Sequence, residues 1–207
     1  MNKINYQKIS DNIINENQKQ ERIPTLLLQS CCAPCSSYVL EYLSRFFSIT
    51  IFYYNPNISP KSEFDKRVNE QKRLVSEMNF ENEVKFIEGD YNPTDFYEIA
   101  KGYEHCKEGF ERCFRCYKLR LEHTAKLAKE MKFDYFTTTL TISPLKNSAK
   151  INEIGRELSN QYGVEYFYSD FKKKEGYKRS IQLSKKYNLY RQNFCGCVYS
   201  KRDEVKK

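Results

Sequence analysis

The chain has 207 residues, of which 40% are hydrophobic and 15% aromatic, which is enough for one complete hydrophobic core. No apolar run approaches the roughly 20 residues that span a bilayer. Residues 1–20 are polar and contain no apolar signal core, so we expect a cytoplasmic protein. Lys and Arg outnumber Asp and Glu by 35 to 27, and the resulting charge of +8 is compatible with a nucleic-acid partner.

The order of the predicted elements indicates an α/β fold. Residues 1–22 are expected to be a flexible polar leader, followed by a single α/β domain over residues 23–207. The apolar run Leu26, Leu27 and Leu28 predicts a buried strand, and Pro34 predicts a helix start directly after it. Helices are expected up to about residue 47 and over 62–78, within 90–101, and over 113–132, 151–162 and 177–188, with further strands over 49–54, 84–88, 134–140 and 164–168.

This alternation of strands and helices predicts βαβ units. We therefore expect a Rossmann-like, mostly parallel sheet with flanking helices and a helical, basic C-terminal segment. In such open sheets ligands bind where strands end and helices begin.

Seven of the eight cysteines fall into three groups: Cys31, Cys32 and Cys35; Cys113 and Cys116; Cys195 and Cys197. In a reducing cytosol structural disulfides are not expected, so metal binding or redox catalysis is the favoured explanation. The first group follows the first strand, where backbone N–H groups and a helix dipole favour thiolates, although the chain must bend if both adjacent thiols contribute. The second group spans one helical turn, and Gly196 allows the third to converge. Cys106 is set apart, as a small buried hydrophobe or a spare thiol.

Four functional interpretations of the chain are considered. A thiol–disulfide oxidoreductase would use Cys32 and Cys35 alone, and a zinc-stabilised nucleic-acid-binding module would use four cysteines. An ATP-using tRNA thiolation enzyme should carry a glycine-rich phosphate loop, whereas residues 30–35 contain no glycine. An iron–sulfur cluster on four cysteines, with the rest at reactive or metal-binding positions, accounts for all seven.

Five motifs in order make the chain similar to a known family over about residues 26–200. They are residues 31–36 (CCAPCS), 52–57 (FYYNPN), 112–117 (RCFRCY, followed by Arg120 and Leu121), 139–144 (TLTISP) and 189–200 (LYRQNFCGCVYS). On these motifs the chain resembles the cobalamin-independent epoxyqueuosine reductases, the QueH family. The resemblance implies an adenine nucleotide α-hydrolase-like (HUP) fold and a [4Fe-4S] cluster with an adjacent mononuclear iron, without cobalamin.

The resemblance also implies a reaction. Epoxyqueuosine at the wobble position of the Asp, Asn, His and Tyr tRNAs would be reduced to queuosine with two electrons and two protons, the electrons coming from an unidentified donor. Some relatives carry Asp where this chain has Cys35, which leaves the identity of the second metal open.

The resemblance makes all seven grouped cysteines candidate ligands. We assign Cys32, Cys113, Cys116 and Cys195 to the cluster and place Cys31, Cys35 and Cys197 near the second iron, as catalytic positions. Tyr54 and Asp90 are candidate proton donors by residue type. Basic residues interleaved with aromatic ones suit phosphate contacts and base stacking, or else a solvated basic helix, and the candidate tRNA-binding residues are Lys173, Lys178, Arg179, Tyr190 and Arg191.

Overall fold

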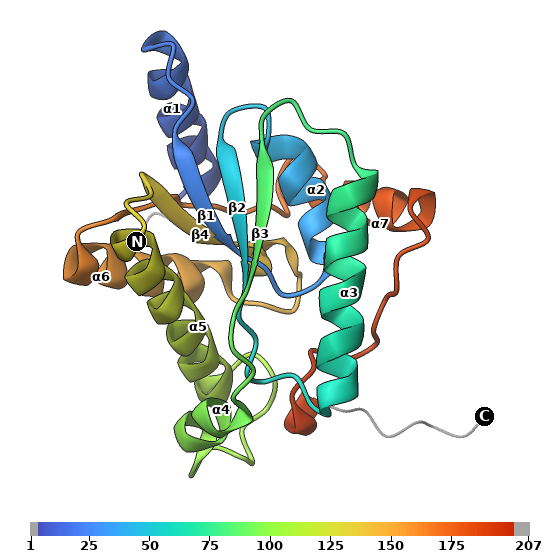
Figure 1. Ribbon diagram of the computed structural model, residues 1–207. Coiled ribbons are helices and arrows are strands. Elements are labelled where there is room, and N and C mark those ends of the chain that lie inside the picture. The colour runs from blue at the N-terminus through green and yellow to red at the C-terminus, as the bar shows by residue number, and fades with distance from the viewer. Residues whose placement is uncertain (1–3, 201–207) are drawn as a thin grey trace.

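A five-stranded, all-parallel sheet organises the computed structural model, which describes residues 4–200 (Figure 1). The strands are β1 (Thr25–Gln29), β2 (Ser48–Tyr53), β3 (Val84–Glu88), β4 (Tyr135–Thr138) and β5 (Glu165–Tyr166), in the order β3-β2-β1-β4-β5. The chain builds outward from β1 in one direction and returns to its other side at β4. This order is Rossmann-like and confirms the predicted α/β class; the finer HUP assignment stays a prediction. The reversal beside β1 marks the usual ligand-binding point.

Seven helices and two short 3₁₀ turns accompany the sheet in the described part of the chain. They are α1 (Tyr6–Lys19), α2 (Ala33–Leu43), α3 (Lys61–Glu77), α4 (Pro93–Ala100), α5 (Glu111–Glu130), η1 (Thr139–Ile142), α6 (Ser148–Tyr162), α7 (Gly176–Lys186) and η2 (Val198–Ser200). None of the helices within residues 4–200 is long and apolar enough to cross a membrane.

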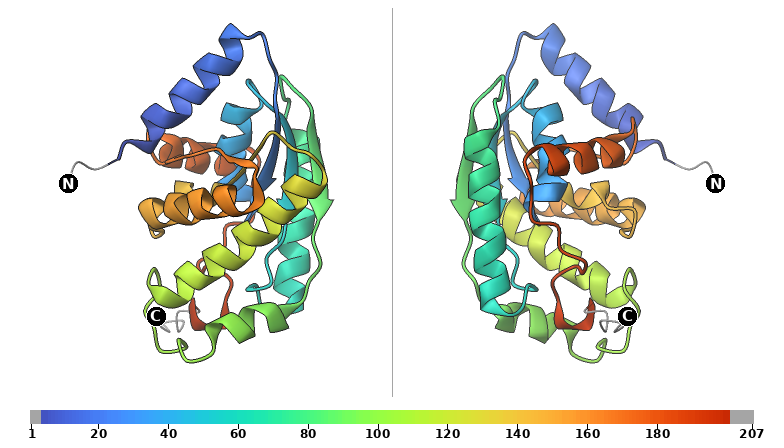
Figure 2. Two further views of the ribbon diagram at one scale, coloured as in Figure 1. Left: turned by 90° about the vertical axis from the view of Figure 1, so that its left-hand side faces the viewer. Right: turned by 90° about the vertical axis from the view of Figure 1, so that its right-hand side faces the viewer.

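Helices cover both faces of the sheet because β1 is apolar on both sides. The ribbon views show helices on both sides of the sheet (Figures 1 and 2). Leu27 packs in one core cluster with residues of α5 and α6, whereas Leu26 and Leu28 pack in another with residues of α1 and α2. All three leucines have 0% exposure, and each such burial contributes about 1.5–3 kcal/mol. A strand buried on both faces reads as a continuous apolar run, as the sequence does here.

Helix α1 lies within the segment expected to be a flexible leader, where the sequence analysis placed no helix. Asn5 caps it by accepting the backbone N–H of Lys8, and Ile14 is buried in the core cluster of α2. The Ser10 hydroxyl donates to the carbonyl oxygen of Tyr168 at 2.6 Å. The structure thus adds an element to this segment, and the division into leader and domain at residue 23 stays a prediction.

Two strands are shorter than predicted. The expected strand over 134–140 ends at Thr138, because the Thr138 hydroxyl accepts the N–H of Leu140 and the chain turns into η1. The fifth strand is reduced to Glu165–Tyr166. The early end of β4 brings residues 139–146 close to the loop that follows β1, which prepares the site described next.

Candidate functional site

The first thiol group lies at the carboxyl end of β1, where α2 begins. Cys32 is the N-cap residue, and Pro34 in the first turn starts the helix. The predicted bend is present, since the sulfurs of Cys31, Cys32 and Cys35 all lie within 4.8 Å of one another. These three thiols could together bind a metal ion.

Hydrogen bonds among the three thiols shift their pKa values in opposite directions. The pKa of Cys31 is lowered well below its usual value because the thiols of Cys32 and Cys35 donate to its sulfur. The pKa of Cys32 is raised to about 12, chiefly because its thiol proton is held in that bond. Thr139, from η1, also donates its hydroxyl to the Cys31 sulfur at 3.5 Å and accepts the Cys31 N–H at 3.3 Å. Cys31 is therefore the thiol of this group that loses its proton most readily.

The other four grouped cysteines line one small cavity together. Cys113 and Cys116 come from the first turns of α5, and Cys195 and Cys197 come from the end of the chain. The backbone N–H of Gly109 donates to the Cys113 sulfur at 3.2 Å. Burial raises the pKa of Cys113 and Cys197, and raises that of Cys116 to about 12, so these thiols are protonated at neutral pH when no metal is bound.

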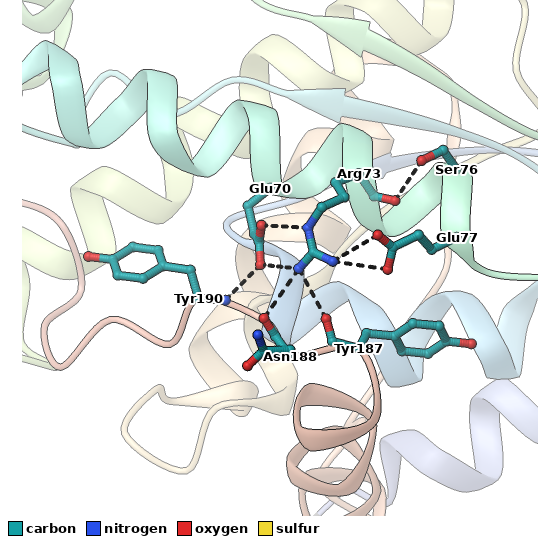
Figure 3. Close-up of polar contacts among 7 residues, drawn as sticks. All are labelled: Glu70, Arg73, Ser76, Glu77, Tyr187, Asn188 and Tyr190. Carbon is teal, nitrogen blue, oxygen red and sulfur yellow. Dashed lines mark hydrogen bonds and ion pairs between the residues drawn. The ribbon is translucent and has the colours of Figure 1, made fainter.

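Helix α3 holds the segment that carries Cys195 and Cys197. We call residues 187–197 the C-terminal segment. Nη2 of Arg73 donates hydrogen bonds to the carbonyl oxygens of Tyr187 and Asn188 in this segment, at 3.1 and 3.3 Å (Figure 3). Glu70, which also binds Arg73, accepts the backbone N–H of Tyr190 at 2.6 Å (Figure 3). The position of the last two thiols thus depends on a helix more than 100 residues earlier in the chain.

Gly196 is required where the C-terminal segment turns between its two cysteines. Its φ is +124°, and a Cβ atom there would lie 2.9 Å from Ile58 and 3.1 Å from Nη1 of Arg67. The Gly196 carbonyl accepts the Ser59 N–H at 3.0 Å, and Arg67 Nη1 donates to the Cys195 carbonyl at 3.0 Å. The freedom expected of this glycine is therefore used for a left-handed backbone in a crowded place.

A larger cavity, of about 380 Å³, lies beside the first thiol group and next to Cys195. Cys31, Cys32, Cys35 and Cys195 line it, together with residues 142–146 after β4 and residues 191–194 of the C-terminal segment. The volume lies within the usual range of small-molecule sites. At its mouth Leu145 is 59% exposed and Tyr177 is 39% exposed.

Lys146 is a residue of this cavity that the sequence analysis missed. Its Nζ lies 3.5 Å from the sulfur of Cys195. Burial alone would lower the pKa of Lys146, but the neighbouring Cys195 sulfur and Tyr117 hydroxyl outweigh burial and raise it. The ammonium group is therefore charged and faces the thiols.

Three arginines are buried around the thiols: Arg67 and Arg112 are 2% exposed and Arg120 is 1% exposed. Arg112 Nη1 donates to the carbonyl oxygens of Tyr103, Glu104 and Cys106, and Arg120 Nη2 donates to Oε1 of Gln29 at 3.3 Å. Arg112 and Arg120 line the small cavity that contains the four cysteines, and Arg67 lines the larger cavity. Sequence reasoning placed none of them in the site.

The candidate proton donors lie away from both cavities. The Tyr54 hydroxyl donates to Asp95 at 2.8 Å, and its ring stacks on His123 at a centroid distance of 4.2 Å. Asp90 is exposed on the loop after β3. Neither residue lines either cavity of the described chain, and their role as donors stays a prediction.

Of the five candidate tRNA-binding residues, the structure places Arg191 at the larger cavity. Arg179 binds both carboxylate oxygens of Glu41, and Lys178 pairs with Glu175. Tyr190 is held by Glu63 and Glu70 of α3, and Lys173 is exposed. Cys106 lines neither cavity in residues 4–200, which leaves it apart from the seven grouped thiols.

Comparisons with known proteins agree with the motif resemblance. A family model described as "Epoxyqueuosine reductase QueH" matches residues 26–203. The chain is 45% identical over 202 residues to the epoxyqueuosine reductase QueH of Staphylococcus epidermidis, covering 96% of this chain and 85% of that protein. It is 44% identical over 200 residues to the protein of that name from Streptococcus pyogenes serotype M1, covering 96% and 78%. The Thermotoga maritima protein of that name is 37% identical over 182 residues, covering 85% and 90%.

Proposed function

Because the chain belongs to the epoxyqueuosine reductase QueH family, we propose that its thiol-lined cavity reduces the epoxide of epoxyqueuosine in tRNA, with an iron–sulfur centre as the electron carrier. The chain is an oxidoreductase by family. In the proposed reaction the epoxide takes up two electrons and two protons, both carbon–oxygen bonds break, and a cyclopentene and one water molecule form. The observation that carries the proposal is the gathering of seven thiols, from three distant segments, around two cavities that share Cys195.

The residues present fit the metal centre that the family resemblance implies. A [4Fe-4S] cluster takes four cysteine thiolates, and four cysteines line the small cavity: Cys113, Cys116, Cys195 and Cys197. The remaining set of Cys31, Cys32 and Cys35 would hold the single iron. This partition differs from the sequence-based one by exchanging Cys32 and Cys197, and the exchange follows from which sulfurs share a cavity.

When bound, such a centre supplies electrons and a cationic ligand position for an oxygen atom. The chain's own residues bind and orient the substrate. Lys146 places a positive charge beside the thiols, where it would stabilise negative charge that develops on the leaving oxygen. The cavity walls, formed by the loop after β4 and the C-terminal segment, would limit access of water to the reacting base.

The mouth of the larger cavity suits a single-stranded RNA loop. RNA-modifying enzymes reach bases that are splayed out of the loop, and they hold them by aromatic stacking and phosphate contacts. Tyr177 and Leu145 supply exposed apolar surface at the mouth, and the exposed Arg191 supplies a charge. The expected partners are the Asp, Asn, His and Tyr tRNAs, with an electron donor that is still to be identified. Arg179 and Lys178 are less suited, since each is paired with a carboxylate.

Iron and sulfide analysis of anaerobically purified protein tests the proposal, together with a mass-spectrometric assay of epoxyqueuosine-tRNA conversion. We expect iron and sulfide, visible absorbance that dithionite bleaches, and queuosine as the product. A colourless protein that contains zinc and leaves the epoxide intact would contradict the proposal and favour the zinc-stabilised nucleic-acid-binding module instead.

A further inference from the structure

Two buried guanidinium groups near the thiols have no carboxylate partner among residues 4–200. Arg67, Arg112 and Arg120 are the three largest fully buried side chains of the described chain. A buried charge costs several kcal/mol unless an opposite charge and hydrogen bonds compensate it. Arg67 is compensated, because its Nε donates to Oε1 of Glu63 at 2.7 Å.

Neutral acceptors bind only some of the N–H donors of Arg112 and Arg120. Arg112 is bound by backbone carbonyl oxygens, and its guanidinium lies 4.8 Å from the centre of the Tyr199 ring. Arg120 has one amide oxygen, that of Gln29. The Nε atom of each is buried without a hydrogen-bond partner within the described residues. Both therefore retain an unmatched positive charge and an unused donor.

Cysteine sulfurs lie near both arginines, and the exposed carboxylate of Glu104 also lies near Arg112. Arg120 interacts with Cys116 and Cys195 of the four-thiol set and also with Cys31 of the three-thiol set. Arg120 is therefore within electrostatic range of both proposed metal positions. Arg112 interacts with Cys113 and Cys197, the remaining members of the four-thiol set. Each sulfur lining the small cavity thus has a buried arginine as a neighbour.

We propose that Arg112 and Arg120 are positioning residues that neutralise the negative charge of the metal–thiolate centre and set its reduction potential. The inference rests on the proposed function, because it needs a thiolate-bound redox centre in this cavity. Reduction adds one electron to a centre that its thiolates already make negative. Fixed cations at its boundary therefore favour the reduced state and raise the potential. The hydrogen-bond partners of both arginines are neutral, which leaves the arginine charges free for this purpose.

The test measures the midpoint potential of the intact protein by spectroelectrochemical titration, with iron and sulfide content measured on the same samples. Arg120→Gln and Arg112→Gln remove the charge, and Arg120→Lys and Arg112→Lys retain it. Arg45→Gln is the matched control, because Arg45 is 52% exposed and pairs with Glu81 at the surface. We expect each Gln variant to favour oxidation by about tenfold, a shift of about 59 mV to lower potential for a one-electron couple. The Lys variants and the control should stay near the wild-type potential.

The outcomes separate this inference from the proposed function. Gln variants that lose iron while the matching Lys variants keep it at the wild-type potential would also support a requirement for charge. Gln variants that keep both their iron and the wild-type potential would overturn the inference, as would loss of iron in the Gln and Lys variants alike. Wild-type protein without iron and sulfide would instead refute the proposed function.

Discussion

Replacing Arg73 by alanine is expected to loosen the C-terminal segment without unfolding the sheet. The change removes the bonds from Nη2 to the carbonyl oxygens of Tyr187 and Asn188. A hydrogen bond of this kind contributes about 0.5–1.5 kcal/mol. Since the Arg73 side chain is 37% exposed, water replaces part of the loss, and we take about 1–2 kcal/mol for the pair. That free energy corresponds to roughly 5- to 30-fold more frequent opening of residues 187–197.

Amide hydrogen exchange measures this opening directly. The Tyr190 amide donates to Glu70 and should exchange faster in Arg73→Ala by the factor given above, whereas amides of β1 should keep the wild-type rate. Arg73→Lys is the matched control: its ammonium keeps the charge beside Glu70 but cannot reach both carbonyl oxygens and two carboxylates at once. We expect intermediate exchange for it. Unchanged exchange at residues 188–190 in the alanine variant would refute the reasoning, and equal acceleration in β1 would show global destabilisation instead.

Three further predictions concern the thiols, the core and the cavity mouth. Cys113→Ala should lose cluster iron and epoxide reduction, whereas Cys106→Ala should keep both. Iron analysis and the tRNA assay distinguish the two variants. Full activity of Cys113→Ala would refute the ligand assignment. Gly155→Ala should destabilise the fold by about 1–3 kcal/mol through overpacking, because the added Cβ would lie 2.3 Å from the buried Tyr166 ring. Calorimetry should show a lower Tm, and an unchanged Tm would contradict this packing. Tyr177→Ala should raise the KM for tRNA several-fold with iron content unchanged, and Tyr177→Phe should restore it, so that equal KM values in the two variants would argue against stacking.

Local patterns were sufficient to predict the fold and the place of the first thiol group. The three consecutive leucines of β1 and Pro34 at the start of α2 are signals within ten residues of each other, and the structure has the strand and the helix there. The alternation of elements likewise predicts a parallel sheet, which is observed. These features depend on periodicity and turn chemistry, which a sequence displays directly.

Long-range contacts decide the features that the sequence did not reveal. Arg112 and Arg120 stand in a helix rich in charged residues and resemble surface arginines in the sequence, but the fold buries both beside the four cysteines of the small cavity. Lys146 follows Ser143 and Pro144 and looks like an ordinary loop residue, although it faces Cys195, which lies 49 residues later. The spacing within each cysteine pair indicated chelation, but only the packing of α5 against the C-terminal segment shows which pairs share a cavity.

The distribution of the seven thiols along the chain also bears on biosynthesis. Cys31 emerges from the ribosome soon after the first strand, whereas Cys195 and Cys197 follow every strand of the sheet and the helices from α1 to α7. Because domains generally fold as units, the last two of the proposed ligands belong to the same folding unit as the sheet. Under the ligand assignment proposed above, stable metal retention requires translation to proceed through Cys197. Under that assignment, a chain that ends before this residue would fail to hold the complete centre, so metal content would report that translation reached the last proposed ligand.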